Sequence, residues 1–249
     1  MNKKILISLL YLLILAGTAH AALRVTDLRT EQLKNPLGID IRHPRLGWRI
    51  ESDEQNVMQT AYHILVASSP ELLEQGKGDI WDSGKIESDA SQWITYQGKI
   101  LKCNAPYYWK VKIDTNKGAT NWSAPASWTT GLFNEADWQG QWIGLDHPAP
   151  GDSETQWSRL AARYLRKEFA LTKEVKRATV HIAGMGLYEL FINGQRIGEQ
   201  VLAPAPTDYR KTILYNTYDV TPQLQKENAI GVILGNGRFY TMRQNYKPY

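Results

Sequence analysis

The stretch Gly186-Leu187-Tyr188-Glu189-Leu190-Phe191-Ile192-Asn193-Gly194-Gln195-Arg196-Ile197-Gly198 decides which fold this chain can adopt. The residues before Asn193 are mostly aromatic or branched. Asn193-Gly194 is the strongest short-range signal of a β-hairpin, because a type I′ turn needs positive φ at both central residues. The sequence therefore predicts one strand that ends at Ile192 and a second strand, from Gln195 to Val201, that runs back antiparallel.

Short strands and turns continue on both sides of this hairpin. Residues Ala178–Ala183 read as another strand, and glycines at 184 and 186 bracket the bend into the hairpin. Thr221-Pro222 is typical of an N-cap followed by proline at the first helical position, and it predicts one short turn. Residues Asn228–Leu234 then form a mostly apolar strand. The pattern indicates an all-β fold.

The first half of the chain predicts a sandwich of its own, because short strands recur at regular spacing with turn signals between them. In Ala61–Ala67, side chains 62, 64 and 66 point one way and 63 and 65 the other, as in a half-buried strand. In Tyr108–Ile113 the apolar side chains 109, 111 and 113 point inward and the two lysines outward. Ser69-Pro70 predicts a capped helical turn. The remaining predicted strands are Val25–Leu28, Pro44–Ile50, Ile80–Ile86 and one that begins beyond Gly118.

The first 21 residues are typical of a secretory signal, with Lys3 and Lys4, a short apolar run and a small-x-small cleavage pattern that ends at Ala21. Their removal lowers the net charge from +4 to +2, because the leader carries two lysines and no acid. So small a charge gives no reason to expect nucleic acid as a partner. We expect a periplasmic or secreted protein with no membrane attachment after cleavage. Cys103 is the only cysteine, so no internal disulfide forms, and we expect its thiol to be buried and inert.

Residues 133–163 are predicted to connect the two sandwiches. Asn134–Trp138 reads as a capped single turn, and Gln139–Gly144 as the first strand of the second sandwich. His147–Ser153 is a turn-rich surface loop.

Several linked motifs carry a resemblance to one family, the bacterial α-L-rhamnosidases, which are inverting glycoside hydrolases. The region Leu23–Leu132 resembles the fibronectin-III-like domain of these enzymes. The residues that follow resemble their N-terminal β-sandwich region, in the motifs Arg166-Lys167-Glu168-Phe169, Gly186 to Gly194, Val201-Leu202-Ala203-Pro204, Thr207-Asp208-Tyr209, Thr217-Tyr218-Asp219-Val220-Thr221 and Leu234-Gly235-Asn236-Gly237.

The resemblance implies two consecutive β-sandwiches after the leader at 1–21. The first, residues 22–132, is fibronectin-III or immunoglobulin-like. The second, residues 133–249, is jelly-roll-like and incomplete at its C-terminal end. In the family the two catalytic carboxylates lie on a helical (α/α)-barrel domain further downstream. The resemblance therefore implies a chain with no catalytic residues, inactive alone, whose partners are that catalytic domain and, through the parent enzyme, a rhamnose-containing glycan.

The acids of the second half stand alone in turn or strand patterns. Inverting glycoside hydrolysis needs two carboxyl groups roughly 6.5–9.5 Å apart. Glu189, Asp208 and Asp219 are better explained as turn caps or solvated residues. His43 and His63 show no metal-ligand spacing, and no motif for a nucleophile or a phosphate-binding loop occurs. We expect no metal and no cofactor.

Two loops are the candidate binding region, Ala203–Arg210 after the hairpin and Gly235–Tyr240 after the last strand. Loops of this kind cluster at one end of a sandwich. The candidate residues are Asp208, Tyr209, Arg238 and Tyr240. One interpretation is that these groups bind a sugar, by hydrogen bonds to its hydroxyls and by stacking on its face. The other is that they dock onto the catalytic domain, and we favour docking. Three hypotheses remain: the N-terminal part of a rhamnosidase, which we favour, a stand-alone carbohydrate-binding module, or a non-catalytic interaction module.

Overall fold

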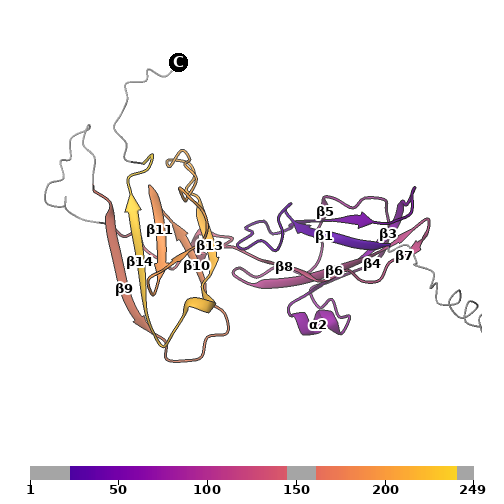
Figure 1. The fold of residues 1–249 in the computed structure, drawn as a ribbon, viewed down its shortest axis with the longest axis horizontal. Coiled ribbons are helices and arrows are strands. Elements are labelled where there is room, and N and C mark those ends of the chain that lie inside the picture. The colour runs from indigo at the N-terminus through magenta and orange to yellow at the C-terminus, as the bar shows by residue number, and fades with distance from the viewer. Residues whose placement is uncertain (1–22, 145–160, 240–249) are drawn as a thin grey trace, which may run out of the picture. The chain divides into compact units, whose positions relative to one another are not determined.

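The computed structural model describes residues 23–144 and 161–239, which divide into two compact units and are almost entirely β (Figure 1). The first unit comprises the chain up to Pro36, Ile41–Leu101 and Pro106–Trp128. The second unit comprises Leu37–Asp40, Lys102–Ala105 and the chain from Thr129 onward. The expected leader and the loop His147–Ser153 lie outside the described residues.

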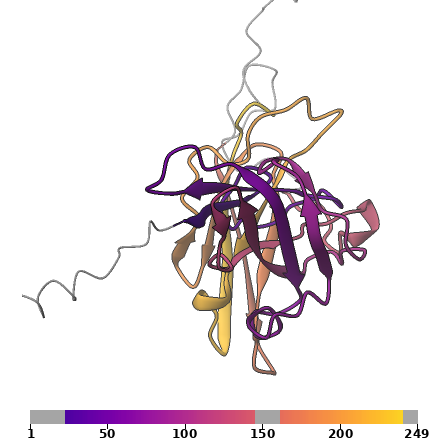
Figure 2. The ribbon, with the colours of Figure 1, turned by 90° about the vertical axis from the view of Figure 1, so that its right-hand side faces the viewer.

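The first unit is a sandwich of two antiparallel sheets, drawn in indigo to magenta in Figure 2. One sheet has the order β1-β2-β5, and the other has the order β4-β3-β6-β7 with β8 also paired to β6. The strands are β1 (Arg24–Thr30), β2 (Arg45–Glu51), β3 (Gln59–Ala67), β4 (Trp81–Glu87), β5 (Ile94–Thr95), β6 (Pro106–Thr115), β7 (Gly118–Ala119) and β8 (Ala126–Thr129). The predicted sandwich of short strands is confirmed.

Large aromatic side chains fill the core of this unit. Trp48, Trp109 and Trp128 are at most 1% exposed. Strand β6 alternates between buried and half-buried residues along its length, which confirms that its apolar side chains point inward. Burying an aromatic side chain stabilises a fold by roughly 2–3 kcal/mol, so these rings contribute much of what holds the sandwich together.

Strand β3 departs from the predicted alternation because both of its faces are covered. Ile64 and Val66 are buried as expected, but Leu65 is buried as well, at 2% exposure. Leu65 packs with Ala67 under Leu73 of α2 (Pro70–Glu74). The predicted cap of α2 is confirmed, since the Ser69 hydroxyl accepts a hydrogen bond from the Leu72 amide at 3.3 Å. Sequence reasoning treated this short helix as a turn and missed that it covers the outer face of β3.

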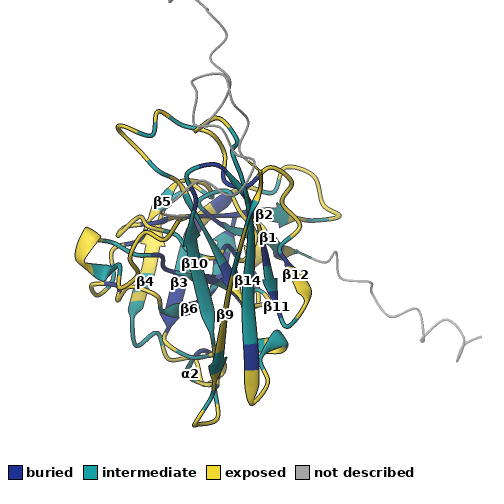
Figure 3. Cartoon of the chain, turned by 90° about the vertical axis from the view of Figure 1, so that its left-hand side faces the viewer, coloured by how far each residue is buried: buried dark blue, intermediate teal, exposed yellow. Residues whose placement is uncertain are grey.

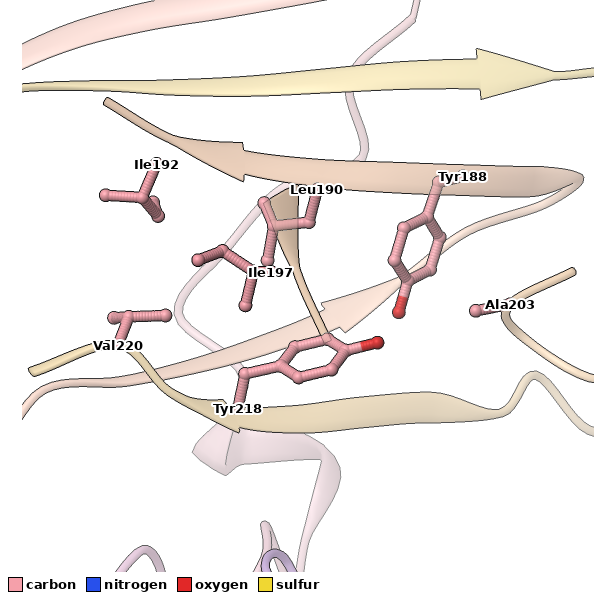
Figure 4. Close-up of a cluster of buried hydrophobic side chains, with 7 residues drawn as sticks. All are labelled: Tyr188, Leu190, Ile192, Ile197, Ala203, Tyr218 and Val220. Carbon is pink, nitrogen blue, oxygen red and sulfur yellow. The ribbon is translucent and has the colours of Figure 1, made fainter. Parts of the chain in front are cut away.

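The second unit also has two sheets. The larger has the order β12-β11-β14-β9, and the smaller pairs β10 with β13. The strands are β9 (Arg163–Ala170), β10 (Thr179–Ala183), β11 (Leu187–Ile192), β12 (Gln195–Ile197), β13 (Tyr215–Asp219) and β14 (Glu227–Gly235). Side chains of β11 and β13 point toward one another between the sheets (Figure 4), and the buried cluster there consists of Tyr188, Leu190, Ile192, Ile197, Ala203, Tyr218 and Val220.

The predicted hairpin forms around Asn193-Gly194, with φ of 51° and 80° at these residues. The Asn193 side chain also ties the turn to β14, because its oxygen accepts from the Ala229 amide at 2.8 Å and its amide donates to Asn228 at 3.0 Å. The returning strand β12 ends at Ile197, and the predicted extension to Val201 is wrong. Gly198 ends it with φ of 81°, lying so close to the Tyr218 ring that a Cβ would be 2.4 Å from it.

Three further expectations are corrected. The turn at Thr221–Gln223 forms as a 3-10 helix, but Val220 occupies the N-cap position and the Thr221 hydroxyl instead donates to Asp219 at 2.6 Å. Gln139–Gly144 is not a strand, because it is exposed throughout and pairs with no strand among the described residues. Cys103 is exposed rather than buried, since it lies in the loop before β6.

The larger sheet of the second unit is thinly covered at the β9 edge. Most residues of β9 and β14 are half-buried or exposed (Figure 3). The register places Leu165 and Lys167 beside Val232 and Ile230 on the core side, yet Lys167 is exposed. Among the described residues the smaller sheet has only two strands, against four in the larger sheet.

None of the helices in the described part of the chain is long and apolar enough to cross a membrane.

Candidate functional site

The two loops chosen from sequence meet at one end of the second unit. Strand β11 begins where β14 ends, since Leu187 pairs with Gly235. The Pro-rich loop is fastened to the same end because the Tyr188 amide donates to the Ala203 carbonyl at 2.8 Å. We call this region, formed by residues 201–212 and 235–239, the loop end.

Glycines allow the backbones at the loop end to touch. Gly186 has φ of 135°, and a Cβ there would lie 2.3 Å from the Gly235 carbonyl oxygen. Gly237 has φ of 49°, and a Cβ there would lie 2.9 Å from the backbone of Gly186 and Leu187. The bend before β11 and the turn after β14 therefore pack backbone against backbone, which fixes where the loop that carries Arg238 begins.

Tyr209 reaches the second loop through an aromatic contact. Its ring meets the Phe239 ring edge to face, with centroids 5.4 Å apart and planes at 87°. Such pairs are worth about 0.5–1.5 kcal/mol beyond the area they bury. Phe239 remains 49% exposed. Sequence reasoning selected Tyr209 but missed Phe239, although its position beside Arg238 and Tyr240 was a signal that could have found it.

Asp208 organises its own loop rather than facing the second loop. Its carboxylate accepts from the Arg210 guanidinium at 3.1 Å and lies 3.9 Å from the Lys211 ammonium. Its carbonyl accepts from the amides of Lys211 and Thr212 at 2.8 and 3.0 Å. Hydrogen bonds from Arg210 hold the pKa of Asp208 below its usual value. Asp208 is thus ionised and already paired, which does not suit a general acid.

The remaining two candidates are placed less tightly. Arg238 is exposed in the turn after β14, so its guanidinium is open to solvent. Tyr240 lies outside the described residues. The structure therefore brings together Tyr209 and Phe239, and leaves Asp208 and Arg238 in separate loops of the same end.

The loop end also exposes aliphatic surface. Val201 and Leu202 are 79% and 69% exposed, and they precede Ala203, which is fixed to β11. Leu202 has φ of 61°, a left-handed conformation that costs a branched residue roughly 1–2 kcal/mol. Exposed apolar side chains in a strained segment are typical of a surface that contacts another domain, another protein or a ligand.

A rigid polar network lies directly beneath. The Asn216 amide donates to the hydroxyls of Tyr188 and Tyr218 at 2.8 and 3.2 Å. Burial raises the pKa of the Tyr188 hydroxyl far above its usual value, so this group stays neutral. Both rings belong to the core cluster (Figure 4). The network therefore supports the loop end and takes no part in acid-base chemistry.

The other acids considered from sequence are also locally paired. Glu189 on β11 pairs with Arg196 on β12 at 3.4 Å, and Asp219 accepts from the Thr221 amide at 2.9 Å. Across residues 23–144 and 161–239, no group of three or more His, Cys, Asp or Glu side chains is arranged to hold a metal. The loop end offers aromatic rings, aliphatic side chains and hydrogen-bonding groups for contact with a ligand or with another domain.

Comparison with known families assigns both units. Residues 25–134 match the family described as "Rha78A-like, N-terminal immunoglobulin domain". Residues 173–249 match the family described as "Alpha-L-rhamnosidase N-terminal domain". The expected resemblance is therefore found in both halves of the chain, and in the expected order.

Longer proteins match over most of this chain. A protein of Formosa agariphila named alpha-L-rhamnosidase is 40% identical in an alignment over 229 residues, and the match covers 86% of this chain and 24% of that protein. The solved structure of alpha-L-rhamnosidase from Dictyoglumus thermophilum aligns with a TM-score of 0.79 and 42% identity, over 86% of this chain and 25% of that one.

The alfa-L-rhamnosidase of Aspergillus terreus aligns with a TM-score of 0.76 and 29% identity, over 88% of this chain and 24% of that one. The chain thus spans about a quarter of the length of these relatives. Its residues 25–134 and 173–249 are the two N-terminal domains of the α-L-rhamnosidase family, an immunoglobulin domain followed by the rhamnosidase N-terminal domain.

Proposed function

We propose that this chain is the non-catalytic N-terminal part of a secreted or periplasmic α-L-rhamnosidase. The whole enzyme would hydrolyse terminal α-L-rhamnosyl residues of plant-type glycans, and this part would support or position its catalytic domain. The observation that carries the proposal is the succession of both N-terminal domains in one chain. Relatives named for this activity are about four times as long.

The chemistry of the described residues supports a non-catalytic role. Hydrolysis with inversion needs one carboxyl group that donates a proton and a second that activates water. In the second unit, the side chains of Asp208, Asp219 and Glu189 are each bound to neighbouring groups. Asp219 pairs with Thr179 at the end of β13 that is opposite to the loop end, so it does not form a pair with Asp208.

We infer that the loop end docks onto a following domain of the same polypeptide. Val201, Leu202 and Phe239 each expose aliphatic or aromatic surface at the loop end. Burying such surface gives roughly 25 cal/mol per Å², and the remaining three quarters of a relative's length supplies a domain to bury it. Asp208, Arg210 and Lys211 add charged groups in the same loop as Tyr209, and interfaces commonly combine an apolar centre with polar groups.

A pair of variants in the full-length parent tests docking. Tyr209→Ala with Phe239→Ala removes the edge-to-face pair and should lower the melting temperature of the parent by more than that of the present chain. Phe169→Ala is the matched control, because that ring lies on β9 opposite Asn228, at the other end of β14 from the loop end, and its loss should lower both melting temperatures equally. Equal destabilisation of the parent and of the present chain would refute docking.

Sugar binding at the loop end is the competing outcome. If this end were a carbohydrate-binding module, L-rhamnose would perturb the ring signals of Tyr209 and Phe239 in the chain by itself. Under the docking proposal, rhamnose should leave the ring signals of Tyr209 and Phe239 unchanged in the chain by itself.

A hydrolysis assay tests the catalytic part of the proposal. The purified chain should release no rhamnose from an aryl α-L-rhamnoside, whereas the full-length parent should. Turnover by the chain that persists after host glycosidases are removed would contradict the non-catalytic role. The coding sequence beyond residue 249 is the decisive companion observation, because it should encode a helical domain with paired acids.

A further inference from the structure

The first unit contains a groove that is lined by aromatic and polar side chains. It lies between the edge of β4 in one sheet and β5 in the other, and its volume is about 370 Å³. The side chains that give it its chemistry are Tyr62, Trp81, Asp82, Trp93, Thr95 and Gln97. Ligand pockets of roughly 300–1,000 Å³ lined by aromatic residues with a few polar groups are typical binding sites. We call it the Trp93 groove.

Trp93 is the least expected residue in it. Its φ is 62°, although bulky side chains avoid this left-handed region at a cost of roughly 1–2 kcal/mol. The ring is 55% exposed, so core packing does not compensate for this cost. Strained residues that the surrounding structure holds in place cluster at ligand sites.

An ion pair fixes the Trp93 ring. The Arg45 guanidinium lies over the ring at 4.5 Å from its centroid. Glu31, whose side chain is only 9% exposed, grips Arg45 through both carboxylate oxygens. Burial pushes the pKa of Glu31 upward, but hydrogen bonds from Arg45 outweigh this and hold the pKa below its usual value. Glu31 therefore stays charged and keeps the guanidinium on the ring.

The loop that carries Trp93 is also held rigidly. The Gln59 amide donates to the carbonyls of Ser88 and Ala90 at 3.1 and 2.7 Å. The Gln92 amide donates to the Trp48 carbonyl at 2.7 Å, and the Trp48 amide donates to Ser91 at 2.9 Å. A rigid loop presents the indole without an ordering cost on binding.

The opposite wall is aromatic and equally fixed. Trp81 packs edge to face on buried Tyr96, with centroids 5.4 Å apart, and Tyr62 packs on buried Trp48 at 5.5 Å. Two indoles and a phenol therefore border one small groove. The electron-rich faces of such rings attract the weakly positive C–H groups of a sugar ring.

Polar groups that hydroxyls could bind lie beside these rings. The hydroxyl of Thr95 and the amide of Gln97 are exposed and make no hydrogen bond to any described residue. One oxygen of Asp82 accepts from His63 and from the Gly84 amide at 2.6 and 2.9 Å, which leaves the second oxygen open. These groups supply acceptors and donors around an apolar surface, which is what a polyhydroxylated ring requires.

The charges favour a neutral ligand. Asp82 is the only charged residue among the described residues that line the groove, and its carboxylate repels an anion. A quaternary ammonium ion would suit an aromatic cage, but Arg45 already places a positive charge on the Trp93 ring. We propose that the Trp93 groove is a binding site for a neutral sugar ring, separate from the loop end. This proposal does not rest on the proposed function, because it uses only residues of the immunoglobulin domain.

The test is a titration of the full chain, followed through its tryptophan indole N–H signals by NMR. The probes are L-rhamnose, D-galactose and D-glucose, taken well above ~1 mM because single sugars in open grooves bind weakly. At least one should shift the indole signals of Trp81 and Trp93 in a saturable way. Trp93→Gly assigns the Trp93 signal and should weaken binding at least tenfold.

The titration uses three variants, of which Trp93→Gly and Thr95→Val alter the groove and Trp142→Ala does not. Trp93→Gly should fold well, since glycine tolerates φ of 62°. Thr95→Val keeps the shape of the strand, removes one hydroxyl and should weaken binding severalfold. Trp142→Ala is the matched control, because that indole is 61% exposed in the second unit and its loss should change nothing.

Three results would overturn the proposal. They are no response to any of the three sugars, an unchanged response in Trp93→Gly and Thr95→Val, and a tighter response to choline than to every sugar. None of these results bears on hydrolysis by the parent enzyme or on docking by the loop end, so the two proposals fail separately.

Discussion

Gly186→Ala should destabilise the second unit strongly, because both its conformation and its surroundings require glycine. Its φ is 135°, and an added Cβ would lie 2.3 Å from the Gly235 carbonyl oxygen, 3.3 Å from the Asn236 oxygen and 3.4 Å from Leu234. The nearest atom belongs to the backbone of β14, so no side chain can rotate away. The backbone must shift where Leu187 pairs with Gly235.

The expected cost is about 3 kcal/mol. Positive φ at alanine costs roughly 1–2 kcal/mol, and a lost ladder hydrogen bond costs about 1 kcal/mol more. The control is Gly194→Ala in the hairpin turn, where φ is 80° but nothing lies within 4 Å of the added Cβ. That variant carries the conformational cost alone, about 1 kcal/mol.

Scanning calorimetry of the full chain measures the difference. At about 4 °C per kcal/mol for a domain of this size, the transition of the second unit should fall by about 12 °C in Gly186→Ala and by about 4 °C in Gly194→Ala. The first unit serves as an internal reference, because neither variant touches it. If the two variants lower the transition equally, the contact between the bend and the turn after β14 does not exist as described.

Three other predictions concern separate features. Burial, and secondarily Arg177, lower the pKa of His181 below 6.5, so the unfolded chain binds a proton at this residue more readily than the folded chain does. The contribution of His181 to the free energy of unfolding should be full above pH 6.5 and should fall as the pH drops below it. Urea unfolding of His181→Gln should lose this part of the pH dependence and keep the part that comes from other groups. Ser69→Ala removes the cap of α2 and should cost about 1 kcal/mol in urea unfolding, whereas no change would show that Pro70 alone starts the helix. The leader should be cleaved after Ala21, so the intact mass of exported protein should match a chain that starts at Ala22; retention of Met1 in exported material would refute the leader.

Some of the candidate functional residues could be found from neighbouring residues in the sequence, and others could not. Tyr209 was selected from sequence because it lies in a Pro-rich loop after a hairpin, and the structure places it at the loop end as expected. Its partner Phe239 is thirty positions away in the chain, and nothing local pairs the two rings. Asp208 offered a carboxylate in sequence, but only the fold shows that Arg210 and Lys211 occupy it.

Trp93 is a second residue whose role could not be predicted from the sequence around it. In sequence it is one of nine tryptophans, with no motif around it. Its left-handed backbone follows from contacts made by Gln59, Trp48 and Arg45, which are 34 to 48 positions away and belong to other strands. No local pattern encodes such a conformation for a bulky residue, because the energy that imposes it is tertiary.

The sequence by itself determined the features whose energy lies within a few neighbouring residues. Asn193-Gly194 set the hairpin because both residues tolerate positive φ, Ser69-Pro70 set the start of α2, and the alternation along β6 set its buried face. Only the tertiary structure decided where β12 stops, that α2 buries Leu65, that Gln139–Gly144 pairs with no strand in the described part of the chain, and which rings meet at the loop end and in the Trp93 groove. Each of these depends on which distant segment lies opposite, and that choice is made by the packing of the whole unit.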